Sequence, residues 1–123
     1  MISIETRNDL TIFHLSGEVT LHDLLAQATL HMTEQPTPMA LWDLLEVSRL
    51  NVTTAEIKAA ATELKAISTG KMPRTVAFVE FREVNMGLAK IFIAFAQMAG
   101  VEHHYRVFRR MEDAMDWLDS QRS

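Results

Sequence analysis

The sequence predicts a single α/β domain with a mixed, mostly parallel five-stranded sheet flanked by helices. The chain has 123 residues, enough for one sizeable core. Short strand-favouring runs alternate with segments of helical periodicity, in the order ββαβαβαβα. This alternation implies parallel strands joined by right-handed crossovers, and the first two strands are expected to form a hairpin.

The first third of the chain predicts that hairpin and a helix. Residues 2–4 alternate apolar with polar side chains, and Leu10–Leu15 is typical of a second strand. Gly17 is expected to end the strand. Thr20 is expected to cap the first helix, with Asp23 completing a capping box. The apolar face of this helix is predicted to be Leu21, Leu24, Leu25, Ala28 and Met32.

The central stretch predicts a buried strand, a loop and a capped helix. Met39–Trp42 is apolar throughout, as expected of a strand covered on both faces, and Asp43 follows it. We expect a polar loop from there to Thr53, which forms a second capping-box pattern with Glu56. Gly70 is the expected end of that helix. Its buried face is predicted to be Ile57, Ala60, Ala61, Leu64 and Ile67.

The last third predicts two further strands, each followed by a helix. Thr75–Phe81 favours a strand, and Asn85 and Gly100 are expected to begin and end the next helix. The core face of that helix is predicted to be Leu88, Ile91, Phe92, Phe95 and Ala99. A final strand over His104–Phe108 and a helix over Met111–Leu118 complete the chain.

Composition excludes several classes of function. The net charge of −4 argues against nucleic acid as a partner, because the basic cluster Arg106, Arg109 and Arg110 is small. The absence of cysteine excludes disulfides and thiolate metal sites. Leu88–Ala99 is the most apolar stretch and is too short to span a bilayer. The amino-terminal residues do not resemble a signal peptide, so a cytoplasmic location is expected. No cofactor is predicted.

Four stretches match a known family in order and spacing. They are Gly17–Thr20, Leu41–Asp43, Arg106–Arg109 and Glu112–Leu118. On these the chain resembles the SpoIIAA-like, or STAS-like, family, which is related in fold to STAS anti-sigma-factor antagonists and CRAL-TRIO lipid-binding domains. The resemblance implies one STAS-like domain over residues 1–123, often dimeric and usually without assigned chemistry.

The resemblance also directs attention to the start of the second helix. STAS antagonists carry a phosphorylatable serine after an aspartate at the start of the helix that follows the Asp-terminated strand. Here the corresponding stretch is Leu50–Thr54, and the Asp-Ser pair is absent. Thr53 and Thr54 are the possible phosphoacceptors, because a helix N-terminus favours an anion. The alternative is that Thr53 only caps the helix.

Polar residues end or follow the two central strands, where an open α/β sheet binds ligands. They are Asp43, Glu46, Glu80, Arg82 and Asn85. Asp43 and Glu80 could perform acid–base work if the pKa of one were raised. No nucleophile or glycine-rich phosphate loop accompanies them, so solvated loop charges are the alternative interpretation.

The five histidines do not predict a metal site. A zinc site needs three or four converging ligands. His22 and His31 lack the helical spacing of a ligand pair, and the neighbours His103 and His104 would point to opposite faces of a strand. With His14, they are expected at the surface or at strand edges.

The side of the third helix opposite its predicted core is unusually apolar for a surface helix. It holds Met86, Ile93 and Ala94 beside Lys90 and Gln97. One interpretation is a partner surface, with Met86 and Ile93 as anchors of a symmetric dimer. A second is that a loop or the last helix covers this side. A third is the edge of an apolar pocket lined by Phe92, Phe95 and Met98, as in lipid-binding relatives.

The sequence therefore predicts a non-enzymatic regulatory or protein-interaction module. Its partner would be a second copy of the chain, as a homodimer, or another regulatory protein. The alternative function is a carrier or sensor of a small apolar, lipid-like molecule. A third hypothesis is an enzyme that uses Asp43 and Glu80.

Overall fold

The computed structural model describes residues 1–34, 36–68 and 73–122, and within these residues one five-stranded sheet carries four helices. The strands lie in chain order. β1 pairs with β2 antiparallel, and the other neighbouring pairs are parallel. The elements are β1 (Ile2–Arg7), β2 (Leu10–Thr20), α1 (Leu21–Thr33), β3 (Met39–Asn51), α2 (Thr54–Ser68), β4 (Thr75–Val79), α3 (Glu83–Met98), β5 (His104–Phe108) and α4 (Met111–Gln121). The predicted fold class and order of elements are confirmed.

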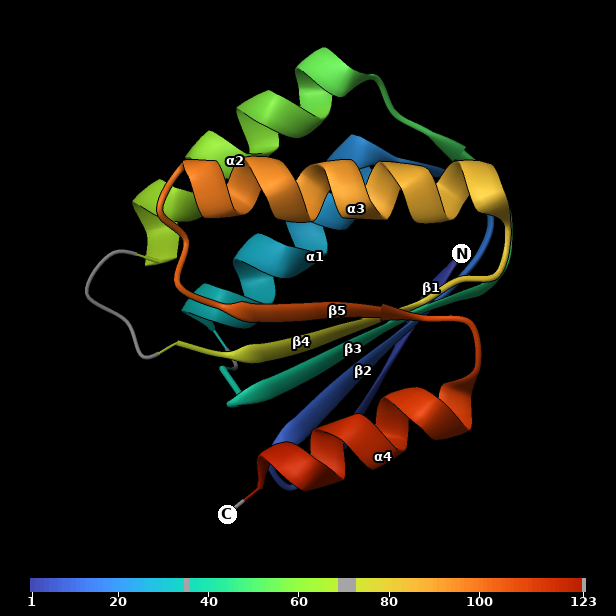
Figure 1. Ribbon diagram of the computed structural model, residues 1–123, viewed down its shortest axis with the longest axis vertical. Helices are drawn as coiled ribbons and strands as arrows, with labels where there is room; N and C mark the ends of the chain where they lie inside the picture. The colour runs from blue at the N-terminus through green and yellow to red at the C-terminus, as the bar shows by residue number, and fades with distance from the viewer. Residues whose placement is uncertain (35, 69–72, 123) are drawn as a thin grey trace.

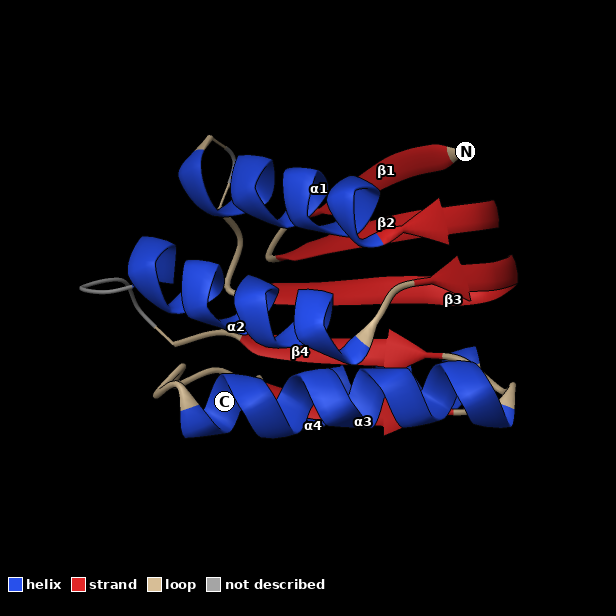
Figure 2. Cartoon of the chain, turned by 90° about the horizontal axis from the view of Figure 1, so that it is seen from above, coloured by secondary structure: helices blue, strands red, loops and turns tan. Residues whose placement is uncertain are grey.

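Helices α1, α2 and α3 lie on one face of the sheet, and α4 lies on the other (Figures 1 and 2). The strand order explains this arrangement. Each crossover from β2 to β5 steps to the next strand in the same direction, so right-handed connections place all three crossover helices on the same face. The chain after β5 turns back beneath the sheet, and α4 covers the face that is left (Figure 1).

Each face of the sheet has its own apolar core. Leu10, Leu41 and Val79 pack with Leu118 of α4. On the other face Phe13 stacks on Trp42, with ring centroids 4.0 Å apart. The prediction that the start of β3 is buried on both faces is confirmed, because Met39 to Trp42 are all at most 7% exposed.

Strands β2 and β3 are longer than predicted. The expected polar loop after Asp43 is wrong, because β3 continues to Asn51 and pairs with Ser16–Thr20 of β2. Gly17 does not end β2. It has a φ of 74°, which only glycine adopts freely, and it lies at a shift in the strand register.

Two of the residues predicted to begin or end helices are confirmed here. The hydroxyl of Thr20 accepts from the Asp23 N–H at 3.2 Å, and the Asp23 carboxylate accepts from the Thr20 N–H at 3.1 Å, so the first capping box is confirmed. Gly100 follows α3 with a φ of 89° and donates to Gln97, as expected of a helix end. The predicted helix end at Gly70 lies outside the described residues.

Helix α3 is rotated relative to the prediction. Met86, expected on an exposed side, is only 7% exposed, and Ile91, expected in the core, is 37% exposed. The helix packs along α2, where Ala96 lies in one apolar cluster with Ala61. Small side chains let two helices approach closely, so this contact, rather than the larger apolar residues, sets the inward face of α3.

Candidate functional site

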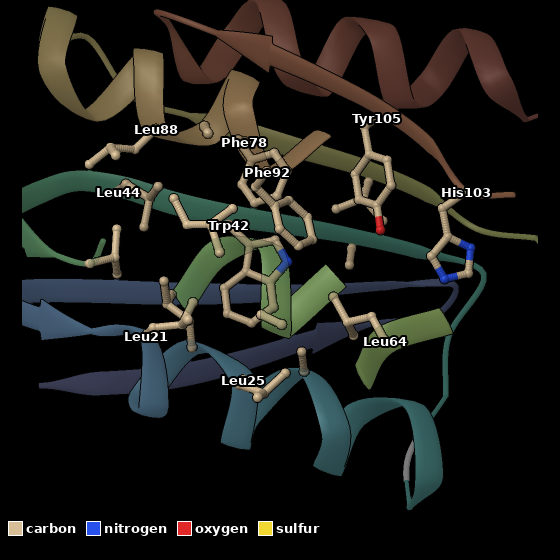
Figure 3. A pocket seen from close by; sticks show the side chains of 18 of the residues that line it. Leu21, Leu25, Trp42, Leu44, Leu64, Phe78, Leu88, Phe92, His103 and Tyr105 are labelled. Atoms are coloured by element: carbon tan, nitrogen blue, oxygen red, sulfur yellow. The ribbon is translucent and has the colours of Figure 1, made fainter. Parts of the chain in front are cut away.

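A largely apolar cavity lies between the sheet and helices α1, α2 and α3 (Figure 3). Helix α2 packs mainly against α1 and α3 rather than on the sheet, which leaves space beneath it. The volume of the cavity is about 120 Å³. A cavity of about 150 Å³ holds benzene, so this space is of the size of a small organic ligand. Large lining side chains include Leu25, Trp42, Leu64, Phe78, Leu88 and Phe92.

One end of this cavity is polar. It is formed by His31 near the end of α1, Arg74 before β4, and His103 and Tyr105 at the start of β5. We call these four residues the polar end. The ring of His103 and the hydroxyl of Tyr105 lie at the end opposite Leu44 (Figure 3).

Arg74 connects the two histidines of the polar end. Its guanidinium Nη1 donates to His31 Nδ1 at 3.1 Å, and its backbone N–H donates to His103 Nδ1 at 3.1 Å. These contacts follow from the sheet. β4 and β5 are parallel neighbours with Thr75 opposite His104, so the residues that precede the two strands lie side by side.

Both histidines of the polar end are neutral at neutral pH. Burial, followed by the nearby charge of Arg74, lowers the pKa of His31 to about 4. Burial first, then Arg74 and His104, lowers the pKa of His103 to about 4 as well. Since Nδ1 of each ring accepts a hydrogen bond from Arg74, the single ring proton is on Nε2.

The two Nε2–H groups differ in their partners. That of His31 lies 2.9 Å from the hydroxyl of Thr37. That of His103 is buried and has no hydrogen-bond partner within the described part of the chain. The hydroxyl of Tyr105 makes no hydrogen bond to the side chains of the polar end, and burial raises its pKa. Two donors of the polar end are therefore unused.

Arg74 is a buried cation without a counter-ion. It is 7% exposed, and burial lowers its pKa. Among residues 1–34, 36–68 and 73–122, no carboxylate lies within 4.0 Å of it, although the pairs that do form include Arg82 with Glu80 and Arg109 with Glu83. The side chains outside those ranges include no Asp or Glu.

The polar end was missed by the sequence analysis. The expectation that the histidines lie at the surface or at strand edges is wrong for His31, which is 7% exposed and inside the fold. The sequence offers one indication of the polar end, which is where two of its residues stand relative to the predicted strands. Arg74 and His103 directly precede two neighbouring strands, so they could have been paired from the predicted topology.

The predicted site at the carboxyl ends of the strands is divided between the two faces of the sheet. Asp43 lies opposite Val79, which faces α4. Glu80 follows Val79 and therefore points to the other face. The two carboxylates have different partners, since Asp43 lies 2.8 Å from His14 and Glu80 bonds to the start of α3, and their joint acid–base role stays a prediction.

Glu80 instead holds the start of α3. It is 0% exposed, and its carboxylate accepts from the backbone N–H groups of Phe81 and Arg82 at 3.0 and 2.9 Å. It also accepts from the side-chain amide of Asn85 at 3.0 Å. The prediction that Asn85 caps the helix is wrong, because α3 begins at Glu83 and Asn85 is buried within its first turn.

Asp43 belongs to a separate polar group on the edge of the α4 face. Its carboxylate lies 2.8 Å from His14 Nδ1, and His14 Nε2 lies 3.3 Å from Glu5. Asp43 first, and Glu5 to a smaller extent, raise the pKa of His14 against the effect of burial. His14 is 39% exposed in its side chain, so this group is open to solvent.

The other predicted ligand residues have different surroundings. Phe92 lines the cavity. Phe95 packs with Ala96 and Val101 instead. Arg82, together with Asn85, borders a second and more open pocket of about 580 Å³ between the end of β3 and the start of α3. Of the predicted set, Phe92 alone reaches the cavity lining.

Thr53 caps α2 in the way that the sequence predicts. Its hydroxyl accepts from the Glu56 N–H at 3.1 Å, and the Glu56 carboxylate accepts from the Thr53 N–H at 2.9 Å. Thr53 and Thr54 are both exposed. The carboxylate of Glu56 already occupies the anion-favouring position at this helix start, and a phosphate on either threonine remains a prediction that a mass measurement after incubation with extract and ATP would test.

The exposed apolar residues of α3 are not those predicted. Of the expected interface set, Lys90 and Gln97 are exposed, Ile93 is half-buried and Met86 is buried. The large apolar residues that face solvent are Val84, Ile91 and Met98, at 76, 37 and 81% exposure. Because they are seven residues apart, they form one stripe along the helix, which we call the exposed stripe.

Two further features limit the chemistry available. Within the described ranges, no three His, Asp or Glu side chains are grouped so that they could hold a metal ion. No helix in those ranges has the length and apolar composition needed to cross a membrane.

Comparison with known proteins places the fold. No protein-family model matches the chain, and no curated protein matches it. An uncharacterised protein of the DUF3478 family from Shewanella loihica PV-4, with a SpoIIAA-like fold, is 22% identical, with a TM-score of 0.56 over 96% of this chain and 92% of that one. The anti-sigma factor antagonist SpoIIAA in its unphosphorylated form is 11% identical, with a TM-score of 0.57 over 97 and 98%.

An anti-sigma factor antagonist from Mycobacterium paratuberculosis is 14% identical, with a TM-score of 0.59 over 97% of this chain and 93% of that one. These likenesses extend over nearly the full length of each chain. The chain therefore has the SpoIIAA-like, STAS-like fold, which confirms the resemblance stated from the sequence.

Proposed function

We propose that this chain is a non-enzymatic regulatory module that senses a small apolar molecule bound in the cavity beneath α2. The observation that carries the proposal is the cavity itself, a concave apolar space with a few polar groups at one end. Small-molecule sites in proteins are typically concave and mostly apolar, with a few polar groups that orient the ligand. The likeness in fold to anti-sigma factor antagonists supports a regulatory role.

The position of the cavity explains how a ligand could be sensed. Its lining comes from three helices and from the sheet, so a bound molecule contacts all the layers on that face. Helix α2 contributes Ile57, Ala60 and Leu64 and makes little direct contact with the sheet. A ligand would fill the space below α2 and stabilise the folded chain, by about 2.7 kcal/mol at a hundredfold excess over its Kd.

Adjacent alanines on α2 provide a matched test. Ala60 lines the cavity and is 3% exposed, whereas Ala59 is exposed. We expect Ala60→Phe to fill the cavity and abolish binding of the uncharged ligand 1-octanol in calorimetric titration, while Ala59→Phe leaves binding unchanged. Circular dichroism would show that both variants fold. Equal binding by the two variants, or no binding by the unaltered chain, would refute the proposal.

A second proposed function is association through the exposed stripe of α3, with a second copy of the chain or another regulatory protein. Val84, Ile91 and Met98 present an apolar line to solvent, with Phe81 at its start 47% exposed. Lys90 and Gln97 flank this line. Apolar stripes rimmed by polar residues are typical of interaction surfaces, and homodimers most often form through one symmetric patch.

Light scattering tests the homodimer. We expect twice the monomer mass at micromolar concentration for the unaltered chain and the monomer mass for Ile91→Glu. Thr62→Glu, an exposed position on α2, serves as the control and should keep the dimer. A monomer for the unaltered chain would exclude self-association and leave another protein as the partner of this surface.

A further inference from the structure

We propose that the cavity binds a single-tailed carboxylic acid, with its carboxylate held by Arg74, His103 and Tyr105 and its tail among the apolar side chains. This inference rests on the proposed function, because it names the class of ligand for the same cavity. It assigns a binding role to three residues that lie at the starts of two neighbouring strands.

The charge of Arg74 requires an anion. A guanidinium cannot lose its proton under ordinary conditions, so Arg74 stays charged although it is only 7% exposed. Burial of an unpaired charge is costly, and proteins normally offset it with a carboxylate. Within the described residues the chain supplies none, and the contact that the guanidinium makes is with the neutral ring of His31. The missing partner is therefore expected from a ligand.

The donors around this charge are arranged for an acceptor. His103 Nε2–H is buried and unpartnered, although more than nine in ten buried polar groups in proteins are satisfied. The Tyr105 hydroxyl and the ring of His103 lie at the same end of the cavity (Figure 3). Arg74 holds the His103 ring through its backbone N–H, which keeps the free Nε2–H fixed. A carboxylate placed here would accept from all three side chains.

The charge balance favours a carboxylate over a phosphate. Among the four residues of the polar end, Arg74 is the charged one, since both histidines are neutral and burial keeps the Tyr105 hydroxyl protonated. A carboxylate carries a single negative charge and has a planar pair of oxygens that matches a guanidinium. A phosphate monoester near pH 7 carries close to two charges and would leave one of them buried without compensation.

The rest of the cavity fits a hydrocarbon tail. Beyond the polar end the lining is apolar, with Trp42, Phe78 and Phe92 among its large side chains. A volume of about 120 Å³ holds roughly five carbon atoms by comparison with benzene, and the open side of the cavity allows a longer tail to continue outward. Octanoate is therefore a suitable probe.

Calorimetric titration with three ligands that share one tail tests the inference. Octanoate, 1-octanol and octyl phosphate differ only in the head group. We expect the unaltered chain to bind octanoate at least tenfold more tightly than 1-octanol, and octyl phosphate more weakly than octanoate. Equal affinity for octanoate and 1-octanol would overturn the inference while leaving the proposed function in place. Tighter binding of octyl phosphate would overturn the choice of a carboxylate.

Two variants locate the head group. Arg74→Met should reduce octanoate affinity to that of 1-octanol and leave 1-octanol binding unchanged. Tyr105→Phe removes one hydroxyl and nothing else, so it should weaken octanoate several-fold and leave 1-octanol unaffected, which keeps the test informative if Arg74→Met fails to fold. An unchanged preference for octanoate in Tyr105→Phe and in folded Arg74→Met would refute the assigned site. If neither octanoate nor 1-octanol binds the unaltered chain, the proposed function fails instead.

Discussion

Replacement of Glu80 by alanine should destabilise the chain more than replacement of any exposed carboxylate. Its carboxylate is fully buried and joins the end of β4 to the start of α3 through three hydrogen bonds of 2.9–3.0 Å. A fourth contact, from the Arg82 guanidinium, is longer at 3.4 Å. Arg82 is the residue that precedes α3 and makes no side-chain cap, and Glu80 instead fixes the two residues before the helix and the Asn85 side chain in its first turn.

The magnitude follows from what each donor does after the carboxylate is removed. The N–H groups of Phe81 and Arg82 lie near the surface and can bond to water. The Asn85 amide is 5% exposed and would be left unpaired, at a cost of about 1–3 kcal/mol. With the lost charge-assisted bonds, we expect Glu80→Ala to lower the free energy of unfolding by about 3–4 kcal/mol, a large part of the 5–15 kcal/mol typical of a domain.

Glu80→Gln tests the same contacts with an uncharged side chain of the same shape. Glu80→Gln keeps one oxygen for the two backbone donors, and Asn85 can turn its amide to offer an oxygen to the new NH₂ group. The expected loss is therefore about 1–2 kcal/mol. Urea denaturation measures both losses, with Glu102→Ala as an exposed control that should stay within about 0.5 kcal/mol. A loss below about 1 kcal/mol for Glu80→Ala would show that this carboxylate does not hold the helix start.

Three further predictions concern single groups. Thr53→Ala should reduce the free energy of unfolding in urea by about 1 kcal/mol, through loss of the cap on α2; no loss would mean that the cap is not formed in solution. NMR titration should give His14 a pKa above 6.5, and Asp43→Asn should lower it, since Asp43 is the main cause of the shift; an unchanged value would contradict the pairing. His31 and His103 should stay neutral in NMR titrations down to about pH 5, because their pKa values are about 4. Between pH 6.5 and 4 the unfolded chain therefore binds more protons than the folded chain. The stability linked to these two rings is present above pH 6.5 and is lost as the pH falls towards 4. For His31 the loss in the free energy of unfolding is up to about 3 kcal/mol.

The fold could be predicted because its signals are local. The capping boxes at Thr20 and Thr53 place the starts of two helices within a residue of where they lie, and the apolar run of Met39–Trp42 identifies the central strand. The second half of β3 was missed because its structure depends on pairing with a distant segment. Residues 44–51 mix four apolar with four polar side chains without strict alternation, and they pair as a strand where β2 continues past Gly17 beside them.

The polar end of the cavity could not be found by the rule that was applied. Open α/β sheets usually bind ligands at the carboxyl ends of their parallel strands, which directed attention to Asp43 and Glu80. The unsatisfied donors of the cavity lie instead at the amino ends of β4 and β5. His31, Arg74 and His103 are far apart in the sequence and come from helix α1 and from the connections that precede β4 and β5. The residues around Arg74 in the sequence do not distinguish it from a solvated loop arginine. Its role follows from its burial and from the absence of a nearby carboxylate among the described residues, and both are properties of the folded chain.

The rotation of α3 connects the cavity with the exposed stripe. Because Ala89 and Ala96 face inward, the larger residues of the helix are divided between two surroundings. Leu88 and Phe92 border the cavity, while Val84, Ile91 and Met98 face solvent. The two sites thus share one helix, which also packs along α2, the helix that a ligand would contact from below. A ligand that binds more tightly to one position of α3 changes the affinity of the exposed stripe for its partner. By thermodynamic linkage, the partner then changes the affinity of the cavity for the ligand by the same factor.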